Sequence, residues 1–505
     1  MRLRNDSREV SMAAAAPVLS TEQPAGKTSL PPSARKTVFR WGVPIALGVL
    51  IRIAPTPAGL STNAWHYFAL FAAVIAALIT EPLPGAAVGL IGVAIATISM
   101  FVGNTPAEAV KWALSGFSND TVWLIFAATV FAIGYEATGL GRRIALVLVK
   151  WLGNRTLGLG YAAALADLIL APFMPSNTAR SGGTIYPVLK NIPPLYGSLP
   201  ERDARKIGSY LMWTGYAITN VTSSMFLTAL APNLLAVEIA RKVAKVDITW
   251  TAWMMGFLPV GILLFAATPL LTYILYPPEI KRGGEVVNWA KDELINIGRI
   301  SRREVTMATL AVLALAGWIK GGPWVAPVTV AISVISLMLL TKVITWNDIA
   351  ANKQAWGVLV WFATLVAMAD ALNTVGFLKW FADRTTARLA NVPQVALIIG
   401  LVAVFFYIHY LFASSTAHTA AVLPVFLAAI VTVKGLPIRA VTLMLVYSLG
   451  LLGVISPYAT GPSPIWYASG YIPTRDFWRL GFIMGTIFVL VLLMVGLPWV
   501  LHFAA

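Results

Sequence analysis

Long apolar stretches recur along almost the whole chain, from about residue 41 to residue 501. An apolar run of about 18 or more residues is typical of a membrane-spanning helix, because its side chains can face the hydrocarbon core of a bilayer. The pattern therefore predicts an all-α polytopic membrane protein. The eleven predicted spans cover residues 41–54, 64–80, 85–102, 121–139, 207–240, 251–276, 304–320, 324–342, 356–376, 436–471 and 479–502.

Two further apolar stretches, residues 157–190 and 394–433, are each interrupted near the middle by a short polar segment. The first segment reads Ser-Asn-Thr-Ala-Arg and ends at Arg180, and the second reads Ser-Ser-Thr-Ala-His and ends at His418. We predict that both stretches are hairpins that return to the membrane side on which they begin. With the N-terminus in the cytoplasm, this arrangement leaves most Lys and Arg residues in cytoplasmic segments, as the positive-inside rule expects.

Composition supports a membrane protein and excludes several other classes. Hydrophobic residues make up 58% of the 505 residues and charged residues only 11%, whereas soluble domains carry roughly a quarter charged residues. The chain has no cysteine and only four histidines, which excludes thiolate metal sites and argues against a metalloenzyme. No catalytic triad and no phosphate-binding loop is apparent. We therefore expect no enzymatic activity, no bound metal and no cofactor.

The net charge of +16 could indicate nucleic-acid binding. However, the Lys and Arg residues lie mainly in segments that are predicted to be cytoplasmic, where they would fix the orientation of the protein in the membrane. No nucleic-acid partner is therefore predicted. Residues 1–38 are rich in Arg, Lys, Ser, Pro and Ala and contain no apolar core. This composition argues against a cleaved signal peptide and favours a disordered cytoplasmic tail. A short organellar transit segment is the alternative.

The two halves of the chain, on either side of a polar linker at residues 277–303, resemble each other. Four features recur in the same order at offsets of 232–238 residues: an apolar span, an amphipathic stretch, a polar hairpin tip and a broken span. An odd number of predicted spans separates the copies, so the second copy is expected to be inverted, as in many secondary transporters. The predicted divisions are a tail (1–38), scaffold helices (39–120), the first repeat (121–276), the linker (277–303), scaffold helices (304–355) and the second repeat (356–505).

The polar tips have a physical rationale. Pro172 and Pro175 are expected to end the first arm of the first hairpin. A helix that begins inside the bilayer leaves unpaired N–H groups, which Ser, Asn and Thr side chains can cap. Where several such helix ends meet, their N–H groups and positive dipole ends form an anion site.

The paired tips, each followed by a Pro-containing broken helix, resemble the divalent anion/sodium symporter family. They are most similar to its citrate/succinate and 2-oxoglutarate/malate translocator branch. The resemblance implies eleven spans and two opposed re-entrant hairpins, a homodimer in the lipid bilayer, and an elevator-type motion of the hairpin domain. It also implies that substrate carboxylates contact residues 176–178 on one tip and 414–416 on the other. Ser415 stands where the family usually has Asn.

Each tip carries a cationic or protonatable residue at the same repeat position, Arg180 and His418. We hypothesise that these residues replace the sodium ions of coupled relatives and make the cycle an obligatory exchange, because a fixed charge cannot leave with the substrate. Arg180 could instead be a snorkelling or salt-bridged residue, and His418 a hydrogen-bonded packing residue. An Arg180→Ala variant is expected to lose transport and keep the fold.

Together with the fixed cations, the resemblance implies sodium-independent exchange of small di- or tricarboxylates such as succinate, malate, citrate, tartrate or 2-oxoglutarate across a bacterial inner membrane. A Na⁺- or H⁺-coupled symporter of the same fold is the main alternative, and a channel or a transporter of unrelated anions such as sulfate is another. The predicted substrate-binding residues are Ser176, Asn177, Thr178, Arg180, Ser414, Ser415, Thr416, His418, Thr228, Thr460 and Ser463.

Overall fold

The computed structural model describes residues 34–200, 202–321, 324–389 and 392–503, and most of the predicted N-terminal tail lies outside them. These residues form helices and no β-strand apart from one isolated bridge. The helices of the first half are α1 (Ala34–Ile53), α2 (Thr62–Thr80), α3 (Gly85–Ile98), α4 (Pro106–Ser115), α5 (Asp120–Thr138), α6 (Leu140–Leu152), α7 (Thr156–Leu170), α8 (Tyr186–Leu189), α9 (Gly208–Met225), α10 (Ala231–Ile239) and α11 (Trp250–Leu275). Those of the second half are α12 (Glu285–Ile297), α13 (Arg302–Lys320), α14 (Pro327–Leu340), α15 (Trp346–Ala350), α16 (Lys353–Thr374), α17 (Phe377–Leu389), α18 (Gln394–Tyr407), α19 (Ser415–Val431), α20 (Ile438–Leu451), α21 (Ser463–Tyr467), α22 (Thr474–Val491) and α23 (Leu497–Phe503).

Within the described residues, seven helices are long and apolar enough to cross a membrane, and several shorter apolar helices accompany them. Two of the seven are the first arms of the predicted hairpins, at Thr156–Phe173 and Gln394–Leu411. The sequence pattern did not predict α4, and the polar linker contains the helix α12, which packs against α6. Both helices are polar on one side, so their apolar residues form no continuous run.

The chain reverses direction in both interrupted stretches. In the first, Arg180 on the returning arm pairs with Asp167 on the first arm, with Nε 3.2 Å from Oδ2. In the second, the ring of His418 on α19 lies 4.5 Å from the ring of Phe405 on α18, measured between centroids. Each stretch is therefore a hairpin whose polar segment forms the turn.

Corresponding helices of the two repeats begin and end in the same way. The side chain of Asn119 accepts a hydrogen bond from the backbone N–H of Val122 at the start of α5, and Asn352 does the same for Ala355 in α16. Both helices are followed by a glycine with positive φ, Gly139 at 73° and Gly376 at 85°, a conformation that glycine adopts without a steric penalty. The chain then enters the amphipathic helices α6 and α17.

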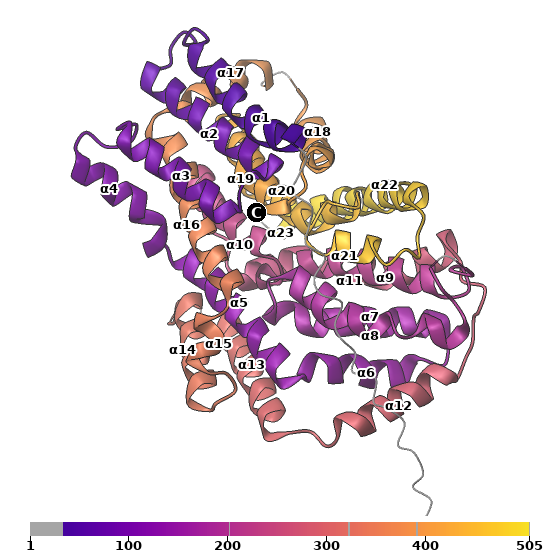
Figure 1. Ribbon diagram of the computed structural model, residues 1–505. Helices are drawn as coiled ribbons and strands as arrows, with labels where there is room; N and C mark the ends of the chain where they lie inside the picture. The colour runs from indigo at the N-terminus through magenta and orange to yellow at the C-terminus, as the bar shows by residue number, and fades with distance from the viewer. Residues whose placement is uncertain (1–33, 201, 322–323, 390–391, 504–505) are drawn as a thin grey trace, which may run out of the picture.

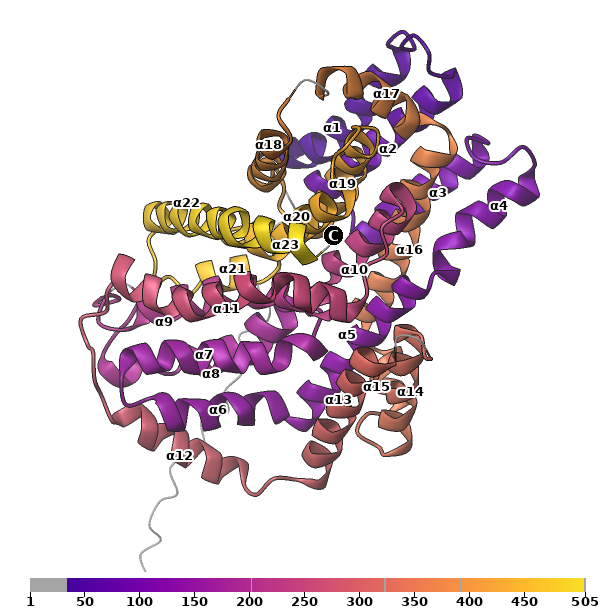
Figure 2. The ribbon, with the colours of Figure 1, turned by 180° about the vertical axis from the view of Figure 1, so that it is seen from behind.

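Figures 1 and 2 show how the repeats are placed. α6 and α12 lie at one end of the molecule and α17 lies at the opposite end, while α5 and α16 run through the middle. Because α6 and α17 are equivalent in the two repeats, their position at opposite ends agrees with an inverted arrangement.

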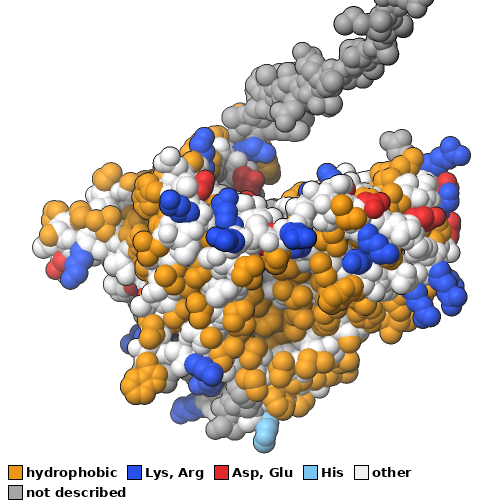
Figure 3. Space-filling model, turned by 90° about the horizontal axis from the view of Figure 1, so that it is seen from below, with side chains coloured by type: hydrophobic (Ala, Val, Ile, Leu, Met, Phe, Trp, Pro, Cys, Tyr) orange, Lys and Arg blue, Asp and Glu red, His pale blue; other side chains and the backbone are white. Residues whose placement is uncertain are grey.

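Much of the protein surface is apolar. Figure 3 shows a broad area of hydrophobic side chains over the lower part of one face, bordered above by a row of charged side chains. Ile53 of α1, Ile98 of α3 and Leu340 of α14 are more than 70% exposed, at 72%, 82% and 77%. Such a surface is unfavourable in water and is expected where helices face lipid.

Candidate anion-binding site

The two hairpin tips meet at one cavity of about 190 Å³. This volume is below the roughly 300–1,000 Å³ typical of sites for drug-sized ligands, so the cavity suits a small metabolite. The residues that line it are Thr129, Pro175, Ser176, Asn177, Thr178, Leu230, Ala231, Pro232, Gln354, Val358, Trp361, Phe362, Ser414, Ser415, Thr416, Thr460 and Gly461. The cavity thus brings together seven of the residues predicted from sequence, namely Ser176, Asn177, Thr178, Ser414, Ser415, Thr416 and Thr460.

The first tip is fixed by three hydrogen bonds that leave its small polar side chains on the cavity wall. The Ser176 hydroxyl accepts from the backbone N–H of Ala179 at 3.2 Å and so caps the returning helix. The carbonyl of Pro175 accepts from the N–H of Ala231 at 2.9 Å, which joins the tip to the first turn of α10. The amide of Asn177 donates to the Thr460 hydroxyl at 3.0 Å and joins the tip to the break in the second repeat.

The second tip repeats the capping of the first. The Ser414 hydroxyl accepts from the backbone N–H of Ala417 at 3.4 Å and caps α19. The Ser415 hydroxyl donates to the carbonyl of Ala459 at 3.5 Å, so the residue that departs from the family pattern is tied to the second broken helix. The side chain of Thr416 is 8% exposed, at the cavity wall.

Among the residues that the structure describes, no side chain that lines this cavity carries a formal charge. Three helices begin at the cavity instead: α19 at the second tip, α10 at Ala231 and the π-helix η3 (Thr178–Ile185) at the first tip. The N-terminus of a helix carries a partial charge of about +0.5. Convergent helix ends with hydroxyl and amide groups can therefore bind carboxylates without a cationic side chain in contact.

Arg180 does not line the cavity, which corrects the expectation that it faces the substrate. Its side chain is fully buried behind the first tip and pairs with Asp167, which is 1% exposed. Its Nη1 donates to the carbonyls of Met174 and Ala229, both at 2.7 Å, and its Nη2 donates to the Ser223 hydroxyl at 3.0 Å. The charge that was expected to act as a free cation is thus compensated by Asp167, and the guanidinium holds the tip against the first broken helix.

His418 also lies behind its tip and not in the cavity. It is fully buried, and its ring packs edge-on against Phe405 and Phe412, with centroids 4.5 and 5.2 Å apart. Neither ring nitrogen has a hydrogen-bond partner among the described residues. The neighbouring His409 donates through its Nε2–H to the carbonyl of Ala459 at 2.8 Å. These surroundings do not provide a partner that would stabilise a protonated His418.

Thr228 and Ser463 belong to the broken helices and support the site without lining it. The Thr228 hydroxyl donates to the carbonyl of Pro172 at 2.6 Å and accepts from Trp250 Nε1 at 3.1 Å. The Ser463 hydroxyl accepts from the backbone N–H of Thr460 at 3.0 Å. Both therefore satisfy polar groups at helix breaks, which is the alternative role expected for such residues in a membrane.

Sequence reasoning missed Asp167 and the cavity wall formed by α16. Asp167 is the only acidic residue between positions 157 and 190, and buried charges in membrane segments usually pair, so the sequence did contain a signal for the Arg180 partner. Gln354, Trp361 and Phe362 of α16 carry no comparable signal, because an amide and two aromatic rings on an apolar helix are equally expected at a lipid interface.

The chain is similar to known membrane transporters in sequence and in fold. A family model described as "Sodium:sulfate symporter transmembrane region" matches residues 35–504. Proteins named L-tartrate/succinate antiporter from Escherichia coli strain K12, Shigella sonnei strain Ss046 and Shigella flexneri are 46% identical over 474 residues, covering 91% of this chain and 97% of each relative. The crystal structure of the YdaH transporter of Alcanivorax borkumensis is similar in fold, with a TM-score of 0.54 and 14% identity, covering 93% of this chain and 97% of that one.

Proposed function

The chain belongs to the sodium:sulfate symporter transmembrane family, also known as the divalent anion/sodium symporter family, and from this membership we propose that it exchanges small dicarboxylates, with L-tartrate and succinate as the first candidates. It is a multi-pass membrane transporter and not an enzyme. The substrate pair is suggested by the names of relatives that are 46% identical over 91% of the chain.

The observation that carries the proposal is the cavity shared by the two tips. A four-carbon dicarboxylate has a negative group at each end, and the cavity has a capped helix end on each side. One carboxylate would accept hydrogen bonds from the groups of residues 176–178, and the other from those of residues 414–416. The hydroxyl groups of tartrate would face the α16 wall, where Gln354 offers an amide.

The same site gives a physical reason for exchange. The helix ends and hydroxyl groups that face the cavity are fixed parts of the protein and cannot leave with the substrate. If the hairpins and broken helices cross the membrane as one body in an elevator-type motion, an empty site would carry these unpaired polar groups through a region without water, which costs several kcal/mol for each unpaired group. A bound dicarboxylate satisfies them, so the loaded form moves and the empty form does not. Arg180 contributes by holding the first tip and not by adding free charge.

Counterflow in proteoliposomes tests the proposed function. We expect labelled succinate to enter only when the liposomes contain unlabelled succinate or L-tartrate, and to enter equally well in Na⁺ and K⁺ buffers. The named relatives are antiporters, so uptake is expected to depend on internal counter-substrate and not on a Na⁺ gradient. Uptake into empty liposomes that is driven by a Na⁺ gradient would favour the sodium-coupled symporter instead.

We further propose that the protein is a homodimer with a cytoplasmic N-terminus in a bacterial inner membrane, as the family resemblance and the bacterial relatives suggest. The exposed apolar faces of α3 and α14 could be covered by a second copy or by lipid. We expect purified protein to have twice the 54.2 kDa mass of one chain by native mass spectrometry after the detergent is removed. A particle of one chain mass at micromolar concentration would contradict the dimer.

A further inference from the structure

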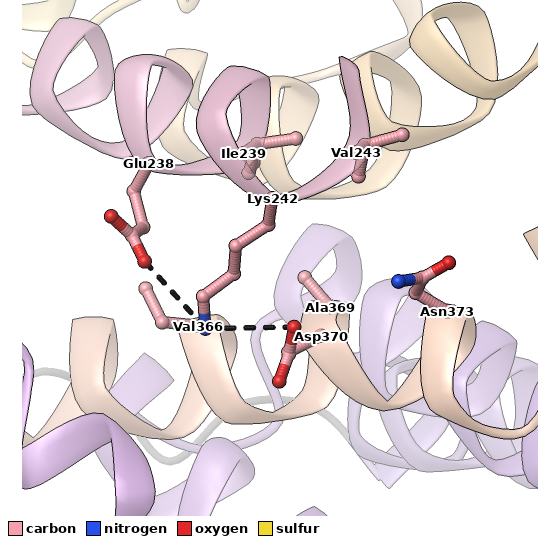
Figure 4. Close-up of a pocket in the computed structure, with 8 residues that line it drawn as sticks. All are labelled: Glu238, Ile239, Lys242, Val243, Val366, Ala369, Asp370 and Asn373. Atoms are coloured by element: carbon pink, nitrogen blue, oxygen red, sulfur yellow. Dashed lines mark ion pairs between the residues drawn. The ribbon is translucent and has the colours of Figure 1, made fainter. Parts of the chain in front are cut away.

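A cluster of charged side chains ties α10 to α16 away from the cavity. Past its C-terminal end, α10 continues as η6 (Ala240–Ala244), and the Lys242 ammonium lies 3.6 Å from the Asp370 carboxylate of α16 and 3.6 Å from Glu238 of α10. Figure 4 shows Lys242 extending between the two helices with both ion pairs drawn. The Lys242 side chain is 28% exposed and that of Asp370 is 34% exposed.

Glu238 extends the same cluster to the start of α5. Its side chain is 1% exposed, and Arg241 lies 2.6 Å from its Oε2. It also accepts a hydrogen bond at 2.8 Å from the amide of Asn119, the residue that caps α5. Arg241 in turn lies 3.6 Å from Asp120 in the first turn of α5. The end of α10 is thus joined by charged contacts to both long central helices, α5 and α16.

The helices α10 and α16 also line the cavity, but with their opposite ends. α10 contributes Ala231 and Pro232, and α16 contributes Gln354, Val358, Trp361 and Phe362. Gln354 is exposed and is sixteen residues before Asp370, which corresponds to about 24 Å along a helix. The charged cluster is therefore far from the exposed edge of the cavity.

We propose that the Lys242–Asp370 pair, supported by Glu238, is a latch that stabilises the conformation in which the cavity is open beside Gln354. The inference rests on the proposed transport cycle, in which the body containing α10 moves along α16 and this pair must separate. The pair is partly exposed, and such pairs stabilise only modestly, so a latch of this kind changes the populations of two conformations without preventing either.

The absence of cysteine from the chain allows a direct test in the full-length protein. A Gln354→Cys substitution supplies a single thiol at the exposed edge of the cavity, and its rate of reaction with a maleimide reports how often that edge is open. We expect Lys242→Met or Asp370→Asn on this background to slow labelling roughly two- to fivefold. The double variant should be no slower than the more affected single variant, because both changes remove the same contact.

Two matched variants separate the latch from general effects of charge. Lys245→Met removes a positive charge from an exposed residue nearby that forms no ion pair within the described residues, and it should leave labelling unchanged. Lys242→Arg keeps the charge and should label at the parent rate. If Lys242→Met shows reduced thermal stability, the comparison of Asp370→Asn with the parent still decides the question.

Equal labelling rates in the parent, Lys242→Met and Asp370→Asn proteins would show that the Lys242–Asp370 pair does not act as a latch. The measurement needs no substrate, so it is independent of the counterflow test. A protein that exchanges dicarboxylates but shows no change in labelling contradicts the latch alone. A protein that shows the change in labelling but no exchange supports the latch and contradicts the proposed substrates.

Discussion

Replacement of Arg180 by alanine is expected to abolish exchange and to lower the free energy of unfolding by about 3–5 kcal/mol, the cost of leaving a buried charge without its partner. Asp167 would remain 1% exposed with no cation beside it. The carbonyls of Met174 and Ala229, which accept from the guanidinium at 2.7 Å, would also lose their donor. This expectation differs from the one drawn from sequence, in which the variant loses transport and keeps its fold.

The prediction is measured by the thermal midpoint of the detergent-purified protein together with counterflow. The double variant Asp167→Asn/Arg180→Met removes both charges and should recover more than half of the lost stability, because a neutral pair avoids the unpaired carboxylate. It should not recover exchange, since the first tip loses the donors that hold it. An Arg180→Ala protein with the parent thermal midpoint and parent exchange rate would show that the buried pair supports neither the tip nor the site.

The second large effect is expected from Gly461→Ala. A Cβ atom at this position would lie 1.9 Å from the Thr178 hydroxyl oxygen, far closer than two such atoms can approach. Thr178 lines the cavity at the first tip, so its side chain must move away from its present position at the cavity wall. Overpacking of this kind costs about 1–3 kcal/mol. If this cost destabilises the conformation that binds substrate, the affinity falls roughly 5- to 150-fold.

Substrate affinity is measured by the concentration dependence of counterflow or by calorimetry. Gly400→Ala is the matched control, because a Cβ there meets nothing within 4 Å, and it should bind with parent affinity. The double variant Thr178→Ala/Gly461→Ala should bind no more weakly than Thr178→Ala alone, since the clash is then absent. Parent affinity in Gly461→Ala would mean that Thr178 does not contact the substrate.

Much of the fold could be predicted from sequence because its signals are local. Apolar runs define the spans, and polar interruptions such as Ser176–Asn177 and Ser414–Ser415 mark the hairpin turns. The repeated order of these features predicts an inverted pair. The amphipathic helices α4 and α12 were missed because half of each surface is polar, and a search for continuous apolar runs does not detect them.

The role of the charged residues could not be predicted in the same way. Arg180 and His418 occupy equivalent positions in the two repeats, and this equivalence suggested equivalent contact with substrate. In the structure both are fully buried behind the tips, one paired with a carboxylate and the other among aromatic rings. Whether a buried cation faces a ligand or a counter-charge depends on the direction of its side chain, which the spacing of residues along the chain does not define.

The close contact between Gly461 and Thr178 was also beyond the reach of sequence, because it joins residues that are more than 280 positions apart. The contact between Lys242 and Asp370, which are 128 positions apart, could not be predicted for the same reason. Both contacts depend on how the two repeats pack against each other. Taken alone, a charged or small residue near a helix end is as readily explained by a role in ending that helix.

The two tips are expected to bind the two ends of a dicarboxylate in one shared cavity. A cryo-electron microscopy structure of the protein with bound L-tartrate or succinate tests this most directly. We predict one carboxylate against residues 176–178, the other against residues 414–416, and no contact with Arg180 or His418. A larger hollow of about 520 Å³ is lined in part by Glu136, Arg142 and Lys190, and substrate bound there, with the space between the tips empty, would contradict the account.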